Sequence, residues 1–128
     1  MIKLIQKLED FLNQKCFKLE EIKDKGYILI YEFADLLLLI DEDYNKSKSI
    51  DLKRNGVSSN WLELTLLRSY ILKNEDYLKP LSFEKESSFF IDYFDKLLEI
   101  LNDKSYQATL SALDIMKKNR VRVRYGPR

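Results

Sequence analysis

The run YILIYEFADLLLLIDE at residues 27–42 is the most apolar stretch of the chain, and the expected fold depends on how it is interpreted. Its first half, residues 27–33, is rich in aromatic and β-branched residues and would also suit a buried strand. Apolar residues continue with little interruption to Ile40, however, and this length favours one helix over one strand. The pattern predicts a helix from about Tyr27 to Glu42 that is apolar nearly all round and lies at the centre of a bundle.

The segments around this run repeat apolar residues at helical spacing. Helices are expected at about residues 2–15, 17–25 and 61–73, after Ser82 and after Ser105. Only three glycines and two prolines interrupt the 128 residues, and so few breakers favour long helices. We therefore expect an all-α fold, a compact bundle of five to six helices. Residues 1–119 would form a single helical domain, and residues 120–128 a short extended basic segment docked on the domain or on a partner.

Two acids interrupt the apolar run, and a buried carboxylate costs several kcal/mol unless it is paired. These acids are Glu32 and Asp35, and Arg68 similarly interrupts the apolar segment at residues 61–72. We expect an internal ion pair between Arg68 and these acids. Two alternatives remain: a polar strip that lines a groove for a partner, or an enzyme that uses the two carboxyls with displaced pKa values.

The residue types exclude several kinds of active site. The chain has no histidine, which rules out Ser-His-Asp and Cys-His arrangements and removes the commonest metal ligand. Its three scattered glycines form no phosphate-binding loop. The single cysteine, Cys16, extends the apolar face of the first expected helix and is expected to pack as a small hydrophobe. We therefore expect a protein that is not an enzyme and has no cofactor.

The polar stretch at residues 41–59 is expected to be a connection, either a solvated one or a contact loop. It begins like a calcium-binding loop, with acidic or amide side chains at the first, third and fifth positions. Lys46 stands where such a loop needs glycine, and Leu52 stands where a glutamate should complete the site. No metal site is therefore predicted.

Cysteine usage and hydropathy bear on the compartment. One cysteine allows no internal disulfide and suits a reducing environment. The apolar run of residues 27–40 is too short and too charged to cross a bilayer, and the first fifteen residues lack the unbroken apolar stretch of a secretory signal. We expect a cytoplasmic protein without membrane contact.

The basic charge is concentrated at the end of the chain. Residues 117–128 contain six basic residues and no acid, so residues 1–116, with 16 basic and 21 acidic residues, carry a formal charge of −5. The sequence RVRVRY at residues 120–125 alternates like an extended ribbon with arginines on one side. One hypothesis is therefore an RNA- or DNA-binding accessory protein that uses Arg120, Arg122, Arg124 and Tyr125.

The leading hypothesis is based on the acidic body of the chain. In size, expected helicity and acidity the chain resembles small intracellular immunity and antitoxin-like proteins, and this resemblance implies an inhibitor that binds another protein. We expect a noncatalytic protein-binding module whose acidic surfaces engage a basic toxin or enzyme. The surplus of tyrosine and phenylalanine is also compatible with a homodimer. The expected partner-binding residues are Asp41, Glu42, Asp43, Asp92, Asp95 and Glu99.

Overall fold

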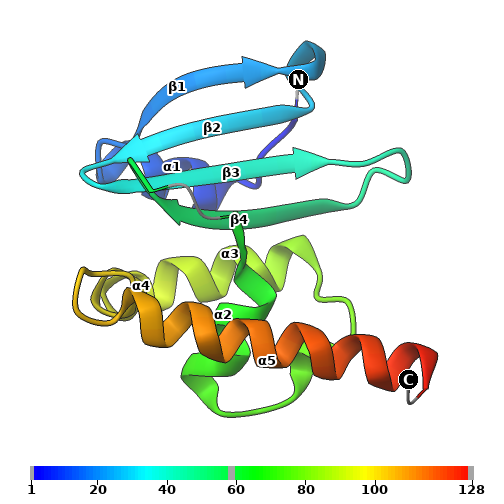
Figure 1. Cartoon of the computed structure of the whole chain (residues 1–128). Coiled ribbons are helices and arrows are strands. Elements are labelled where there is room, and N and C mark those ends of the chain that lie inside the picture. Colours follow the sequence, from blue (N-terminus) through cyan, green and yellow to red (C-terminus); the bar gives the residue numbers. More distant parts are fainter. Residues whose placement is uncertain (1, 58–59, 127–128) are drawn as a thin grey trace.

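The computed structural model describes residues 2–57 and 60–126, and within these ranges it contains a five-stranded sheet and five α-helices (Figure 1). The strands are β1 (Lys18–Lys23), β2 (Ile28–Phe33), β3 (Leu36–Glu42), β4 (Lys48–Arg54) and β5 (Leu62–Glu63). The α-helices are α1 (Gln6–Gln14), α2 (Leu64–Leu72), α3 (Phe83–Asp92), α4 (Phe94–Ile100) and α5 (Tyr106–Tyr125). The predicted all-α bundle is therefore wrong, because the fold combines an antiparallel sheet with helices.

The apolar run at residues 27–42 forms two strands instead of one helix. β2 and β3 pair antiparallel from Ile28↔Asp41 to Phe33↔Leu36 and are joined by a tight turn. Ala34 in this turn has a φ of 49°, a conformation that Gly or Asn usually supplies, so the sequence carries no ordinary turn signal. Both strands are apolar on both faces, and this hides the two-residue alternation by which a strand is normally recognised.

The sheet is a meander in which each strand pairs antiparallel with the next, in the order β1-β2-β3-β4-β5. β4 occupies part of the stretch that was expected to be a connection, with Ile50 and Leu52 fully buried between polar neighbours. β1 occupies the segment that was expected to be the second helix, and all six of its residues are exposed.

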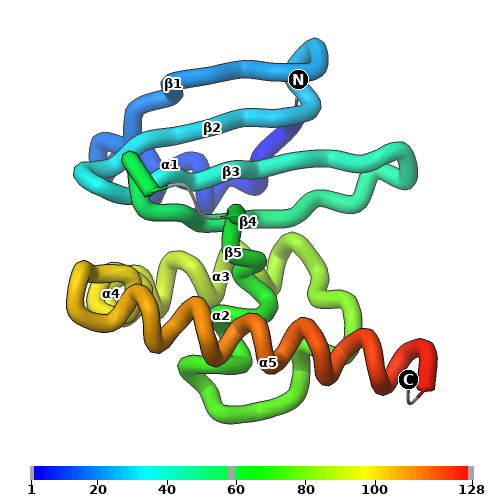
Figure 2. The backbone as a smooth tube through the Cα atoms, in the orientation of Figure 1, coloured from blue at the N-terminus to red at the C-terminus, as the bar shows by residue number. Residues whose placement is uncertain are grey.

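One face of the sheet forms the core. Leu38 and Ile40 of β3 point to this face and join Leu8 and Leu12 of α1 in a single buried cluster. Figure 1 shows α1 behind the sheet, and Figure 2 shows the chain leaving β4 for the helices α2 to α5, which lie below the β4 edge. Phenylalanine rings connect α1, the sheet and the helices α3 and α4, because Phe94 of α4 packs edge-on against rings from α1, β2 and α3.

Four of the six expected helices are present, and the other two segments, residues 17–25 and 27–42, contain strands instead. Residues 6–14 and 64–72 are helical, and the Ser82 Oγ accepts a hydrogen bond of 3.2 Å from the Lys85 backbone N–H at the start of α3. α5 begins directly after Ser105 and continues without interruption through residues 119 and 120 to Tyr125. The extended basic ribbon is therefore a wrong prediction as far as residue 126, and residues 127–128 lie outside the described residues.

Candidate functional site

The face of the sheet opposite the core is also apolar at its centre. It carries four aliphatic side chains that do not belong to the core cluster: Ile28, Ile30, Leu37 and Leu39. Ile30 is 8% exposed, while the other three are half-buried. In the described part of the chain no helix crosses in front of β1 to β3, since α1 lies behind them and α2 to α5 lie below (Figure 1). We call this surface the open sheet face.

The strand register places acids next to these aliphatic residues. One row across the sheet runs Glu21–Ile30–Leu39–Asp51–Glu63, from β1 to β5. The neighbouring rows contain Ile28 opposite Asp41 and Leu37 opposite Glu32. The open sheet face is therefore aliphatic at the centre of β2 and β3, and at β4 and β5 it carries two acids, Asp51 and Glu63, together with Lys53, which lies opposite Leu37.

Four carboxyls gather at the acidic end, and we call them the acid cluster: Asp41, Asp51, Glu63 and Glu86 of α3. Burial, and to a smaller extent the negative charges of Asp41 and Glu63, raise the pKa of Asp51 to about 7, although Lys117 of α5 opposes the rise. Among the described residues the Asp51 side chain makes no hydrogen bond or salt bridge, although Lys117 lies close enough to act on its charge. The negative charge of Asp51 is therefore only partly compensated, by Lys117.

Glu86 is the most deeply buried member of the acid cluster, with only 2% of its surface exposed. Burial, together with the charges of the three other acids, raises the pKa of Glu86 to about 8, although a hydrogen bond from the Ile50 backbone opposes the rise. The carboxyl lies beside β4, to which α3 is packed. The acid cluster thus keeps two carboxyls partly protonated in the neutral pH range.

The other two acids of the cluster have partners. Glu63 accepts two hydrogen bonds from the Arg120 guanidinium, at 3.1 and 2.7 Å, and this pair also raises the pKa of Arg120. Asp41 accepts a hydrogen bond from the Ser49 hydroxyl of β4. Arg120 shows that a guanidinium fits at the edge of the cluster, so a second cationic side chain from outside could approach Asp51 in the same way.

The acid cluster does not form a metal centre in the described residues. Among residues 2–57 and 60–126, no group of three or more acidic or cysteine side chains is arranged so that it could hold a metal ion. The raised pKa values of Asp51 and Glu86 suit these two carboxyls to ionic pairing or proton transfer.

The six predicted partner-binding acids do not form one surface. Asp41 belongs to the acid cluster, but Glu42 pairs with Lys48 at 3.6 Å. Asp43 closes the β3–β4 turn, because its Oδ1 accepts hydrogen bonds of 2.9 Å from the backbone N–H groups of Asn45 and Ser47. Glu42 and Asp43 therefore have structural partners within their own hairpin.

The remaining three predicted acids lie far from this turn. Asp92, Asp95 and Glu99 are exposed at the end of α3 and on α4, at the opposite end of the molecule from the β3–β4 turn (Figure 1). Glu99 pairs with Lys96 at 3.3 Å in an exposed ion pair. These acids are solvated helix positions, and they provide a natural control for the acid cluster.

The expected internal pair of Arg68 with Glu32 and Asp35 is wrong. Arg68 pairs with Asp76 at 2.9 Å, Asp35 is exposed in the β2–β3 turn, and Glu32 lies on the open sheet face. Cys16, which was expected to pack, is exposed with a φ of 61° just after α1.

The two strongly perturbed carboxyls, Asp51 and Glu86, were missed by sequence reasoning. The alternation in KSIDLKR at residues 48–54 could have indicated a strand with Asp51 on its polar side. The proximity of Glu86 to that strand has no local signal, because it depends on the packing of α3.

The predicted nucleic-acid residues lie on α5 and do not share one side. Arg120 is held by Glu63, and Arg122 donates a hydrogen bond of 2.6 Å to the Asn119 side chain. Arg124 and Tyr125 are exposed in the last turn of the helix. Two of the three arginines thus already have partners within the chain.

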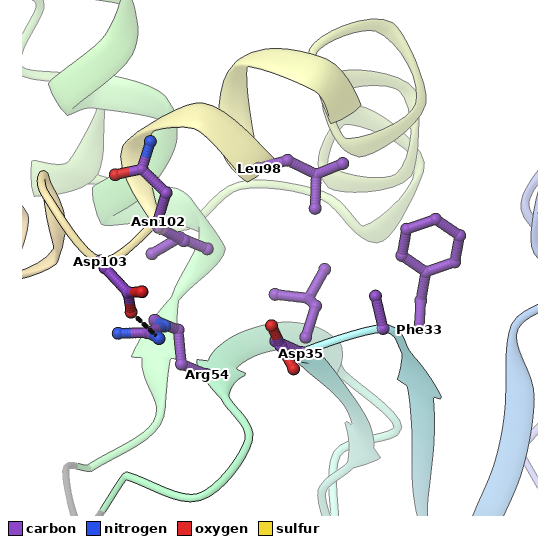
Figure 3. A pocket seen from close by; sticks show the side chains of 9 residues that line it. Phe33, Asp35, Arg54, Leu98, Asn102 and Asp103 are labelled. Carbon is purple, nitrogen blue, oxygen red and sulfur yellow. Dashed lines mark hydrogen bonds and ion pairs between the residues drawn. The ribbon is translucent and has the colours of Figure 1, made fainter.

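A pocket of about 240 Å³ lies between the β2–β3 turn and the loop that connects α4 to α5. Figure 3 shows the ion pair of Arg54 and Asp103 at one side of this pocket, with Phe33 and Leu98 as apolar walls. Arg54 also lies over the Tyr106 ring, at 5.3 Å from its centroid. The guanidinium is thus already engaged by the protein, and the acid cluster remains the stronger candidate site.

No family model matches the chain, and no curated protein or solved structure matches it. No helix among the described residues is long and apolar enough to pass through a membrane. The function is therefore inferred from the residues and their geometry alone.

Proposed function

We propose that the protein is a noncatalytic protein-binding module whose open sheet face binds a basic segment of a partner protein. The observation that carries this proposal is that β2 and β3 are apolar on both faces, while α1 covers only one of them. An antiparallel sheet in water usually alternates apolar and polar faces. A second apolar face bordered by charge is typical of a protein interaction surface.

The acid cluster defines the chemistry of the partner. Asp51 is partly buried among other acids, so a lysine or arginine brought against it would relieve repulsion and replace lost hydration. Complementary charge would also accelerate association and reject acidic competitors. A basic toxin or enzyme that is inhibited by an immunity- or antitoxin-like protein fits this description.

The test compares charge reversal on the open sheet face with the same change on α3 and α4. A partner is first captured from a lysate of the producing organism after nuclease treatment, and its affinity is then measured for the wild type, D41K/D51K and D92K/D95K. We expect D41K/D51K to weaken binding by roughly a hundredfold and D92K/D95K by about twofold or less. Equal effects of the two variants would contradict the proposal.

The noncatalytic part of the proposal has its own test, because carboxyls with pKa values near neutrality could also transfer protons. The absence of histidine supports binding over catalysis. If the captured partner is converted chemically by the wild type and left unchanged by D51N, the protein is an enzyme and the proposal fails.

A further inference from the structure

The pocket between the β2–β3 turn and the α4–α5 loop contains no member of the acid cluster, and the proposed function does not use it. Its volume of about 240 Å³ suits a small molecule. Phe33 and Leu98 line it as half-buried walls, and its more deeply buried lining is Leu36 and Leu101, each 4% exposed. The cavity is therefore largely apolar, and the few charged side chains around it decide which head group a ligand carries.

Three charged side chains line the pocket, two acids and one arginine. Arg54 and Asp103 form an ion pair, so their charges compensate each other. The third charge belongs to Asp35, whose exposed side chain makes no hydrogen bond or ion pair with any residue that the structure describes. In Figure 3 this carboxylate lies between Arg54 and Phe33. The pocket therefore combines an apolar cavity with one carboxylate whose charge no ion pair balances.

The β2–β3 turn fixes the position of Asp35. The turn consists of Ala34 and Asp35, and the φ of 49° at Ala34 is strained for an alanine, a conformation that persists only where the surrounding structure imposes it. Here the strands pair up to Phe33↔Leu36, and the Asn55 backbone N–H donates a hydrogen bond of 2.6 Å to the Asp35 carbonyl oxygen. A carboxylate on such a constrained turn loses little backbone entropy when a ligand binds.

We propose that this pocket binds a small primary amine with a compact apolar body. The apolar body would fill the cavity between Phe33 and Leu98, and the ammonium group would donate a hydrogen bond to the Asp35 carboxylate. Charge complementarity selects a cation, because a carboxylate ligand would have to displace Asp103 from Arg54 and would also meet the charge of Asp35.

The amine site and the proposed function use different parts of the sheet. Asp35 precedes β3, whereas Asp41 lies near the other end of that strand. Asp35→Asn should therefore leave the binding of a basic partner through Asp41 and Asp51 unchanged. Failure of the amine site would leave the proposed function intact, and failure of the proposed function would leave the amine site intact.

The experiment follows the backbone amide signals of the isotope-labelled full chain by two-dimensional NMR during titration with phenethylamine. We expect saturable shifts at Asp35, Arg54 and Asn102 with a dissociation constant of about 1 mM, because so small a ligand makes few contacts. Phenylacetate has the same ring with the opposite charge and should bind at least about fivefold more weakly.

Two variants and a matched control assign the binding to the pocket. Asp35→Asn removes the unpaired charge and should weaken phenethylamine binding about fivefold. Leu98→Trp adds a larger side chain at a half-buried wall position and should abolish the saturable shifts by filling the cavity. Asp95→Asn makes the same charge change at an exposed acid of α4 that does not line the pocket, and it should leave the dissociation constant unchanged.

Three results would overturn the proposal. The first is the absence of saturable shifts when phenethylamine is added to the wild type. The second is tighter binding of phenylacetate than of phenethylamine, which would mean that the ligand is an anion bound by Arg54. The third is equal affinity of phenethylamine for Asp35→Asn and the wild type.

Discussion

The two faces of the sheet differ in what covers them, although both are rich in leucine and isoleucine. On the core face Leu38 and Ile40 are fully buried under α1 and its neighbours. On the open sheet face Leu37 and Leu39 are half-buried, and Leu39 lies opposite Asp51 of β4, whose pKa is raised. The residue types alone do not distinguish the two faces. The difference in exposure shows that coverage by a second element decides which of these aliphatic residues stabilise the fold and which remain available for binding.

The sharpest test of this difference compares two adjacent leucines of β3. Leu38→Ala should lower the free energy of unfolding by about 3 kcal/mol, because it removes a fully buried side chain and leaves a cavity. Leu39→Ala should cost only about 1 kcal/mol, since this side chain is half-buried. Urea denaturation measures both values, and equal losses would mean that the open sheet face is part of the core.

The second test concerns the pH dependence of Glu86. The pKa of this carboxyl is raised in the folded protein to about 8, so between pH 5 and 8 the folded state holds a proton that the unfolded state has lost. Stability should therefore be highest below the ordinary glutamate pKa and fall as pH rises to about 8. Glu86→Gln should remove roughly 2 kcal/mol of this decrease, as measured by denaturation at pH 5 and 8. If the stability of Glu86→Gln still falls with pH as steeply as that of the wild type, Glu86 is not the cause of the pH dependence.

Asp51 is expected to cause a smaller decrease in stability with rising pH. Its pKa is raised to about 7, so Asp51→Asn should stabilise the protein by about 1 kcal/mol at pH 8 and have little effect at pH 4. The same variant should weaken partner binding, which would separate stability from function at one residue. Thermal unfolding at both pH values provides the measurement, and destabilisation at pH 8 would contradict the assigned repulsion.

The smallest effects are expected at ion pairs. Arg120→Ala should destabilise the protein by about 1 kcal/mol, because its bidentate pair with Glu63 is partly buried. Lys96→Ala should change stability by only about 0.3 kcal/mol or less, since the Lys96–Glu99 pair is exposed. Guanidinium denaturation compares the two variants, and the ranking fails if the exposed pair contributes more.

Helices with a regular apolar stripe were predicted close to their observed bounds, because the 3.6-residue period and the Ser82 cap act within a few residues. The candidate site was predicted only in part: Asp41 was identified, but Asp51, Glu63 and Glu86 come together through strand register and the packing of α3. The alternation in RVRVRY was interpreted as a strand, yet these residues extend α5, which Asn119 and Arg120 anchor to distant residues. A two-residue alternation over six positions is too short to outweigh a helix that is already formed before it.

The sequence by itself determined that this protein lacks histidine chemistry, that its charge is segregated along the chain, and that four of the stretches with helical spacing become helices. Only the tertiary structure decided that residues 27–42 bend at Ala34 into two strands, and that one of their two apolar faces stays open. The physical reason is that helical hydrogen bonds join residues four apart, whereas strand pairing and the burial of a face depend on partners far along the chain.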